Sequence, residues 1–321
     1  MKNAVIVLGT FLLDLLAGDP PWLPHPVRFF GRVIAAYERL VRRLAREPLA
    51  LLASGILLAV LLPAGTYIVT ARGLEMLYRW HHATGFLVEF YLVATTIAVR
   101  GLGEAAGAVG QALAVRDLPL ARKKVAALVG RDTAQLDARG VARAAVESVA
   151  ENTVDAAVAP LFYAFLGGAP LALVYRAVNT LDSMIGYRHG DYRYLGWAAA
   201  RLDDLLNFLP ARLTGLLFVL AAFLLRGDWR RVWRTVRRDG RKHPSPNSGI
   251  PEAAIAGFLG VQLGGPSTYR GVPSFRPFLG EPLVPLGLEQ IAGAVGLLYM
   301  VAVLAVILGF GLRMIFGYWA G

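Results

Sequence analysis

The chain has 321 residues, of which 56% are hydrophobic and only 17% are charged, and its 33 Lys and Arg against 22 Asp and Glu give a formal net charge of +11. Soluble domains average about 25% charged residues, so this composition excludes an ordinary soluble enzyme and a disordered chain. The lack of cysteine excludes disulfides, thiolate catalysis and iron–sulfur clusters. The excess of basic residues requires no nucleic-acid partner, because Lys and Arg also set membrane topology.

Apolar stretches of helical length predict an all-α, polytopic membrane protein with roughly four to six spans or re-entrant helices and cytoplasmic polar loops. Two stretches, 48–70 and 291–312, contain no charge and are long enough to cross about 30 Å of hydrocarbon. The predicted spans are 4–17, 48–70, 83–100, 154–175, 205–225 and 291–317. Since no linker or internal repeat divides the chain, we predict a single membrane-embedded domain over residues 1–321.

One predicted span is interrupted. Two apolar halves of the stretch 154–178 meet at Gly167-Gly168-Ala169-Pro170, a sequence that breaks helices. The stretch is therefore either one kinked span or a helical hairpin that enters and leaves on one side. Broken helices at membrane depth occur only where they are buried or line a cavity.

The distribution of basic residues predicts the sidedness. Lys and Arg are dense in 18–47, 101–154 and 226–290 and sparse in 71–82 and 176–204. With six spans, the three basic segments lie on one face, which we expect to be cytoplasmic, and 176–204 lies on the other.

The first polar cluster follows the N-terminal apolar run. Its four prolines between residues 20 and 26 prevent a helix and leave an extended loop that presents Asp19, His25 and Arg28. The alternative is a proline-stiffened connector at the membrane interface, with Trp22 as its aromatic anchor.

The second cluster lies on a predicted helix, 136–155. Its charged residues recur every four positions: Arg139, Arg143, Glu147, Glu151 and Asp155. Such neighbours face each other, so salt bridging explains the arginines. It explains three successive acids poorly, because they repel one another at the mouth of an apolar segment. With Asn152 between them, oxygen ligands on one side favour metal or substrate binding.

Two further clusters come before the probable span 205–225 in the chain. Arg176, Asn179 and Asp182 share one face of an otherwise apolar helical pattern, which is costly unless they line a cavity or bond to another helix. Asp203 precedes the span and is four residues from Asn207, so it either caps a helix or extends a polar site.

The fifth cluster places Arg241, Lys242 and His243 before a Pro-Ser-Pro-Asn-Ser-Gly turn that contains Asn247. Cations and small polar residues before a helix N-terminus favour a phosphate site. The arginines at 230–238 are explained as a patch that faces anionic lipid. No G-x-x-x-x-G-K-[ST] sequence occurs, so a nucleotide site here is not a P-loop.

These clusters together resemble the CobD/CbiB family of cobalamin biosynthesis, the adenosylcobinamide-phosphate synthases. The resemblance spans most of the chain in order. It is carried by GDPPWLPHPVRFFGR (18–32), VGRDT (129–133), ARAAVESVAENTVDAAVAPLF (142–162), YRAVNTLDSMIGYR (175–188), ARLDDLLNFLPARLT (200–214) and RDGRKHPSPNSGIPEAAIAGFLGVQLGG (238–265).

The resemblance implies a multi-pass ligase of the cell (inner) membrane, late in vitamin B12 assembly. It implies that ATP and Mg²⁺ drive amide formation between the propionate carboxylate of adenosylcobyric acid and (R)-1-aminopropan-2-ol or its O-phosphate, through an acyl phosphate. The implied partners are the corrinoid, the amine, the lipid bilayer and other cobalamin-assembly enzymes, with no nucleic acid.

The resemblance also suggests roles for residues. Glu147, Glu151, Asp155 and His25 are the candidate catalytic groups, and Glu151, Asp155 and Asp182 the candidate Mg²⁺ ligands. The candidate substrate-binding residues are Asp19, Arg28, Asn152, Arg176, Asn179, Asp182, Arg188, Asp203, Arg241, Lys242, His243 and Asn247. Among these, the cations would offset phosphate charge and the asparagines would contact the amide-fringed corrin.

ATP use conflicts with the six-span topology, because ATP is cytosolic and 176–188 would face the other side. We expect 154–178 and 205–225 to re-enter, or 176–188 to lie at membrane depth facing a cytoplasmic cavity. A transporter for a polar or anionic solute is the main rival function, although no pseudo-symmetric halves occur. A non-catalytic membrane sensor related to the family is the third alternative.

Overall fold

The computed structural model describes residues 2–18, 22, 24–187 and 192–319. Within these residues four helical runs are long and apolar enough to cross a membrane: Pro48–Trp80, His82–Ala114, Ala138–Ile185 and Leu288–Ile315. A helix pair bent by 44°, Trp197–Leu206 and Phe208–Leu224, makes a fifth if it is one broken span. The protein is therefore a polytopic, mainly helical membrane protein, as predicted.

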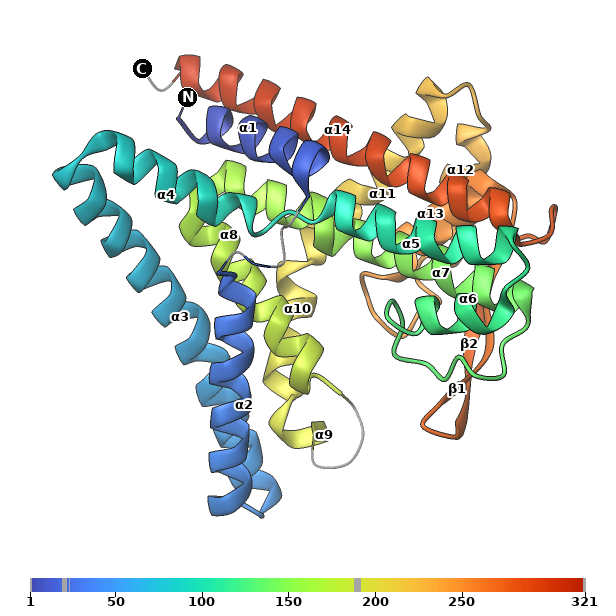
Figure 1. Ribbon diagram of the computed structural model, residues 1–321, viewed down its shortest axis with the longest axis horizontal. Coiled ribbons are helices and arrows are strands. Elements are labelled where there is room, and N and C mark those ends of the chain that lie inside the picture. The colour runs from blue at the N-terminus through green and yellow to red at the C-terminus, as the bar shows by residue number, and fades with distance from the viewer. Residues whose placement is uncertain (1, 19–21, 23, 188–191, 320–321) are drawn as a thin grey trace. The chain divides into compact units, whose positions relative to one another are not determined.

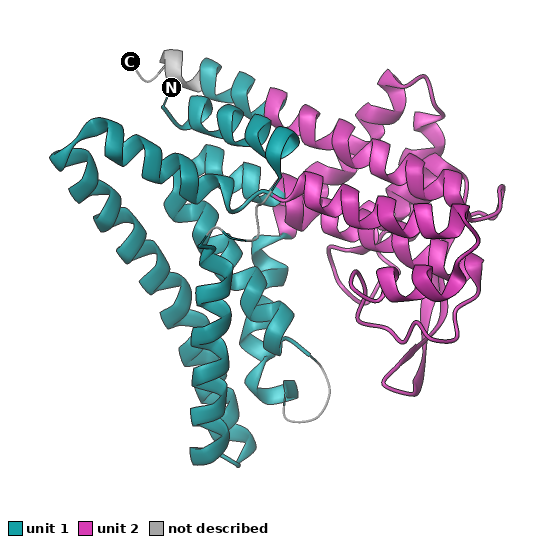
Figure 2. Cartoon of the chain, in the orientation of Figure 1, with its two compact units in different colours: residues 1–97, 159–207, 308–321 teal, residues 98–158, 208–307 magenta. Residues whose placement is uncertain are grey.

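Contacts divide the chain into two compact units (Figure 2). Unit 1 comprises residues 1–97, 159–207 and 308–321, and unit 2 comprises residues 98–158 and 208–307. The single domain predicted for residues 1–321 stays a prediction.

Unit 1 is built from helices. They are α1 (Lys2–Ala17), α2 (Pro26–Leu44), α3 (Pro48–Trp80), α4 (His82–Ala94), α8 (Ala159–Ile185), α9 (Tyr192–Leu195), α10 (Trp197–Leu206) and the end of α14 (Leu288–Trp319) (Figure 1). α8 packs against both α2 and α3. Apolar residues recur at helical spacing and fill the core between them, for example Leu173, Ala177 and Leu181 of α8.

Two glycine positions shape unit 1. Gly167 and Gly168 have non-helical backbone angles, and the φ of Gly168 is +64°, so α8 is broken where the sequence predicted a breaker. Pro170 follows in the next turn. Gly55 of α3 lies so close to α9 that a Cβ there would be 2.0 Å from the Leu195 carbonyl oxygen. Any side chain at Gly55 would push α9 away.

Unit 2 combines helices with one hairpin. Its elements are α5 (Val99–Ala114), α6 (Leu118–Val125), α7 (Ala138–Thr153), the π-helical turn η1 (Val154–Val158), α11 (Phe208–Leu224), α12 (Trp229–Asp239), α13 (Gly249–Leu259), β1 (Gln262–Tyr269), β2 (Val272–Gly280) and the start of α14. α13 packs against α7, α11 and α12. The four-residue ladder predicted over 136–155 lies on α7 and continues into η1.

The antiparallel hairpin β1–β2 is an exception to the all-α prediction. Its register pairs Gln262 with Gly280 and Tyr269 with Val272, with an irregularity between Leu263 and Gly265. The Asp132 carboxylate accepts hydrogen bonds from the backbone N–H groups of Arg270 and Gly271 at the turn, 3.1 and 2.8 Å away. The hairpin is therefore stabilised from outside itself, by a loop that precedes α7.

Candidate active site

In unit 2, Glu147 joins α7 to the hairpin. This side chain is only 2% exposed. One carboxylate oxygen pairs with Arg131, and the other accepts the backbone N–H of Gly264 at 2.7 Å. Arg143 donates to the carbonyl oxygens of Gly264 and Pro266, at 2.5 and 2.7 Å. Protein donors contact both oxygens of Glu147, so this side chain holds β1 on α7, and its predicted catalytic role stays a prediction.

Glu151, one turn further along α7, lies in a different environment. It is half-buried, and its Oε1 accepts a hydrogen bond from the Ser248 hydroxyl at 2.9 Å. Ser248 precedes the first residue of α13. This contact brings the acid ladder of the second predicted cluster to the proline-spaced loop of the fifth, as expected for one site.

The loop 243–249 is internally bonded. The Ser245 hydroxyl accepts the backbone N–H groups of Asn247 and Ser248, at 3.2 and 3.3 Å. Arg212 of α11 donates to the Asn247 side-chain oxygen at 2.7 Å and to the Pro246 carbonyl at 3.2 Å. The predicted substrate residue Asn247 is thus buried and fixed by an arginine that lies within the predicted span 205–225.

His243 and Glu252 form a buried pair. Their side chains are 7% and 1% exposed, and His243 Nε2 lies 3.7 Å from Glu252 Oε1. Neither atom has a hydrogen-bond partner among the described residues. His243 Nδ1 accepts the Ser245 backbone N–H at 3.0 Å, which assigns the proton of the neutral ring to Nε2. His243 is therefore neutral in this arrangement, and its predicted substrate-binding role stays a prediction.

The electrostatics of this pair favour neutral groups. Burial raises the pKa of the Glu252 carboxyl well above its ordinary value, and the charges of Glu151 and Glu147 add to the effect. Burial and the positive charge of Arg276 lower the pKa of the His243 imidazole. Sequence reasoning missed Glu252, which reads as an ordinary acid in the first turn of a helix.

The neighbouring cations divide into bound and free groups. Lys242 Nζ lies 2.7 Å from Asp239 Oδ1, and Asp239 also binds Arg238 and the backbone N–H of Gly280. Although burial opposes the shift, these donors hold the pKa of Asp239 at about 2. Lys242 is thus paired with Asp239, and its predicted phosphate role stays a prediction.

Arg241 remains available for a ligand. It is exposed and has no hydrogen-bond or ion-pair partner in the part of the chain that the structure describes. Arg241 is also near enough to Arg212 for their charges to repel. An anion near both guanidinium groups and the N-terminus of α13 would relieve this repulsion.

Unit 1 brings together a second set of predicted residues. Arg176 donates to the Asn179 side-chain oxygen at 3.5 Å, and Asn179 donates to Asp203 at the same distance. Asp203 also accepts a hydrogen bond from Asn207 at 3.0 Å, and Tyr175 donates to Asn207 at 3.0 Å. Of the two alternatives given for Asp203, these contacts favour a polar site, in which α8 and α10 share a polar contact.

Other predicted residues have local roles or positions. His25 caps α2, because its Nδ1 accepts the backbone N–H of Val27 at 3.2 Å. Asn152 donates to Ser148 on the preceding turn of α7. Arg28 is exposed, and Asp155 and Asp182 are half-buried. Asp19 and Arg188 lie outside the described residues.

The described residues include no group of three or more His, Asp or Glu side chains that could hold a metal ion. Of the predicted ligands, Glu151 and Asp155 lie in unit 2 and Asp182 lies in unit 1. Neither unit therefore assembles the predicted set by itself. Mg²⁺ commonly binds one or two carboxylates together with substrate phosphates, and Glu151 and Asp155 fit that smaller requirement.

A polytopic helical protein with a buried ionic site is a broad class, and comparison with known proteins narrows it. A family profile described as CobD/Cbib protein matches residues 7–298. The cobalamin biosynthesis protein CobD of Geobacter metallireducens is 50% identical over 307 residues, 96% of each chain. CobD of Klebsiella pneumoniae is 45% identical over 309 residues, again 96% of each chain, and CbiB of Salmonella typhimurium is 44% identical over 298 residues, 93% of each.

The chain belongs to the CobD/CbiB family, and its role is in cobalamin biosynthesis. No solved structure matches it significantly.

Proposed function

We propose that this protein is a membrane-bound ligase that forms the amide bond between the propionate carboxylate of adenosylcobyric acid and (R)-1-aminopropan-2-ol or its O-phosphate, driven by ATP. The supporting observation is the similarity, over nearly the whole chain, to cobalamin biosynthesis proteins CobD and CbiB. We further propose that it resides in the cell (inner) membrane with its site open to cytosolic ATP.

The proposed reaction has two steps. A carboxylate oxygen of the corrinoid attacks the γ-phosphorus of ATP, so that an acyl phosphate forms and ADP leaves. The amine nitrogen then attacks the acyl carbon, the C–N bond forms, and the C–O bond to phosphate breaks. The substrate ammonium gives up two protons, of which one ends on hydrogen phosphate and one is released.

The cations near loop 243–249 suit the first step. Arg241 has no ionic partner among the described residues, and the Arg212 guanidinium lies close to it. Together with the N-terminus of α13 they would stabilise charge on the transferring phosphoryl group. Lys242 and His243 contact Asp239 and Glu252 instead. We therefore assign phosphate binding to Arg241 and Arg212.

Glu151 is the carboxylate that we assign to the chemistry. It lies beside the same loop, and unlike Glu147 it is hydrogen-bonded, among the described residues, only to a neutral hydroxyl. With Asp155 it would hold Mg²⁺, which would offset the negative charge of the ATP phosphates. A carboxylate here also suits proton removal from the ammonium. Both roles require the negative charge of Glu151.

The test is direct synthesis. The purified full-length protein in nanodiscs is incubated with adenosylcobyric acid, MgATP and each amine in turn, and products are identified by mass. We expect the amide and a matching amount of ADP. For the variant Glu151→Gln, the matched control is Glu104→Gln, since Glu104 is an exposed acid whose partner among the described residues is Arg100. Absence of amide with both amines would contradict the proposal and favour the transporter or the sensor.

A further inference from the structure

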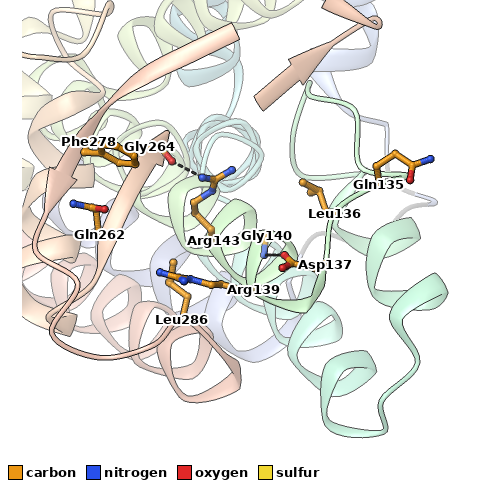
Figure 3. A pocket seen from close by; sticks show the side chains of 10 residues that line it. All are labelled: Gln135, Leu136, Asp137, Arg139, Gly140, Arg143, Gln262, Gly264, Phe278 and Leu286. Carbon is orange, nitrogen blue, oxygen red and sulfur yellow. Dashed lines mark hydrogen bonds between the residues drawn. The ribbon is translucent and has the colours of Figure 1, made fainter. Parts of the chain in front are cut away.

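A pocket of about 460 Å³ lies in unit 2, its lining does not include loop 243–249, and its volume is typical of small-molecule sites. It is bounded by the segment before α7, the first two turns of α7 and the hairpin (Figure 3). None of the sequence clusters placed a ligand there.

The pocket has apolar walls. Leu136, Leu286 and the ring of Phe278 line it, and Phe278 is 44% exposed. Phe275, in the same strand, packs edge-on against Phe278, with ring centroids 5.4 Å apart. An exposed ring beside aliphatic side chains suits a flat, partly apolar ligand that stacks on it.

The polar groups in the pocket are free to bind. Gln135 and Gln262 line it, and neither side chain has a hydrogen-bond partner in the described parts of the chain. Each amide offers both a donor and an acceptor, as the hydrogen-bonding edge of a nucleobase requires. A wholly polar and smaller ligand, such as an aminopropanol phosphate, would leave the apolar walls uncovered.

The charge of the pocket is positive. Arg139 is exposed and lacks an ionic or hydrogen-bonding partner within the described residues. Arg143 is fixed by hairpin carbonyls and still carries its charge. The acid of the lining, Asp137, accepts the backbone N–H of Gly140 at 2.7 Å. Figure 3 shows both arginines projecting from the start of α7. The pocket therefore favours a ligand that also carries phosphate.

The pocket also lies close to the proposed chemistry. Gly264, which lines it, donates its backbone N–H to Glu147. Arg143 and Glu151 are eight residues apart on α7, which is about 12 Å along a helix axis. A ligand bound here would thus lie two turns of α7 from Glu151.

We propose that this pocket binds the nucleoside of a nucleoside triphosphate, stacked on Phe278 and hydrogen-bonded to Gln135 and Gln262, with Arg139 facing its phosphates. The inference rests on the proposed function for the identity of the nucleotide as cosubstrate. It gives the nucleotide a binding site, which no P-loop sequence in the chain indicates.

Equilibrium binding of ATP to the full-length protein, without corrinoid or amine, tests the pocket. We expect Phe278→Ala to weaken ATP binding roughly 5- to 150-fold, the range for lost base stacking. We expect Arg139→Gln and Gln262→Ala to weaken it about tenfold. Phe223→Ala, at an exposed phenylalanine of α11, and Arg234→Gln are matched controls outside the pocket, and each should stay within about twofold of wild type.

Thermal melts establish whether each variant is folded. If Phe278→Ala misfolds, Arg139→Gln still tests the pocket, because Arg139 is exposed. Unchanged ATP affinity in the pocket variants, or no ATP binding by the wild type, would overturn the inference. A raised KM for the amine phosphate with an unchanged KM for ATP would also overturn it. Weakened ATP binding by the variants without any amide synthesis by the wild type would support the pocket and refute the proposed ligase.

Discussion

The two polar clusters differ in how they are held. In unit 2, Glu147 is buried against Arg131 and a backbone N–H that are distant in sequence. In unit 1, Arg176, Asn179 and Asp203 are linked through 3.5 Å contacts. The comparison indicates that the first cluster fixes the backbone of the hairpin, whereas the second joins side chains of α8 and α10 and includes a 3.0 Å hydrogen bond from Asn207 to Asp203.

The largest expected effect is on the stability that Glu147 gives to unit 2, where it anchors β1 to α7. Glu147→Gln removes the partner of the buried Arg131, and breaking a buried pair in this way costs about 3–5 kcal/mol. We expect the melting temperature in detergent to fall by roughly 10 °C or more. The exposed Glu104→Gln should change it little, because surface pairs contribute about 0–1 kcal/mol. A melting temperature of Glu147→Gln within 2 °C of wild type would show that Glu147 is not an anchor.

Glu151→Gln separates chemistry from stability on the same helix. We expect the melting temperature to stay near that of wild type, because Gln can still accept the Ser248 hydrogen bond. Amide synthesis, measured by mass, should fall about 10²-fold or more. Full turnover of this variant at low Mg²⁺ would remove Glu151 from the site.

Asp239, which accepts the backbone N–H of Gly280 at the end of β2, makes the stability of unit 2 depend on pH. Its folded pKa of about 2 lies below the ordinary value of 3.8, so its stabilisation is present above pH 3.8 and is lost as the pH falls toward 2. Since Arg238 and Lys242 are half-exposed, we expect about 1–2 kcal/mol. Denaturant unfolding at several pH values should show Asp239→Asn less stable than wild type at pH 6 and equal to it near pH 2. A constant difference would contradict this origin.

The smallest expected effect is in unit 1. Asn179→Ala removes two 3.5 Å contacts, so we expect less than about 1 kcal/mol of lost stability in thermal melts. If Asn179 contacts substrate, as predicted, the KM for the corrinoid should rise while the melting temperature stays. A large loss of stability would mean that this cluster is an anchor as well.

The helices were predictable because hydropathy and helix breakers are local. The span 48–70, the break at Gly167–Pro170 and the helix that carries Glu147 and Glu151 all appear in the structure. The hairpin was not predicted, since QLGGPSTY has two glycines, a proline and no alternation, and Asp132 and Arg143 hold it from afar.

The site was predictable in part for the same reason. The polar residues of the ladder and loop 243–249 could be identified, and Glu151 does meet Ser248. What each residue does depends on long-range packing. His243 reads as part of a cationic run and is instead buried against Glu252, and Lys242 is bound by Asp239. Neither outcome follows from spacing along the chain.

The most direct measurement follows an oxygen atom. Adenosylcobyric acid labelled with ¹⁸O in its free carboxylate is converted with MgATP and the amine, and the released phosphate is analysed by mass spectrometry. Activation of the carboxylate by the γ-phosphoryl group predicts one ¹⁸O in each phosphate released with an amide. Unlabelled phosphate, or phosphate released without amide, would contradict ligase activity by this protein.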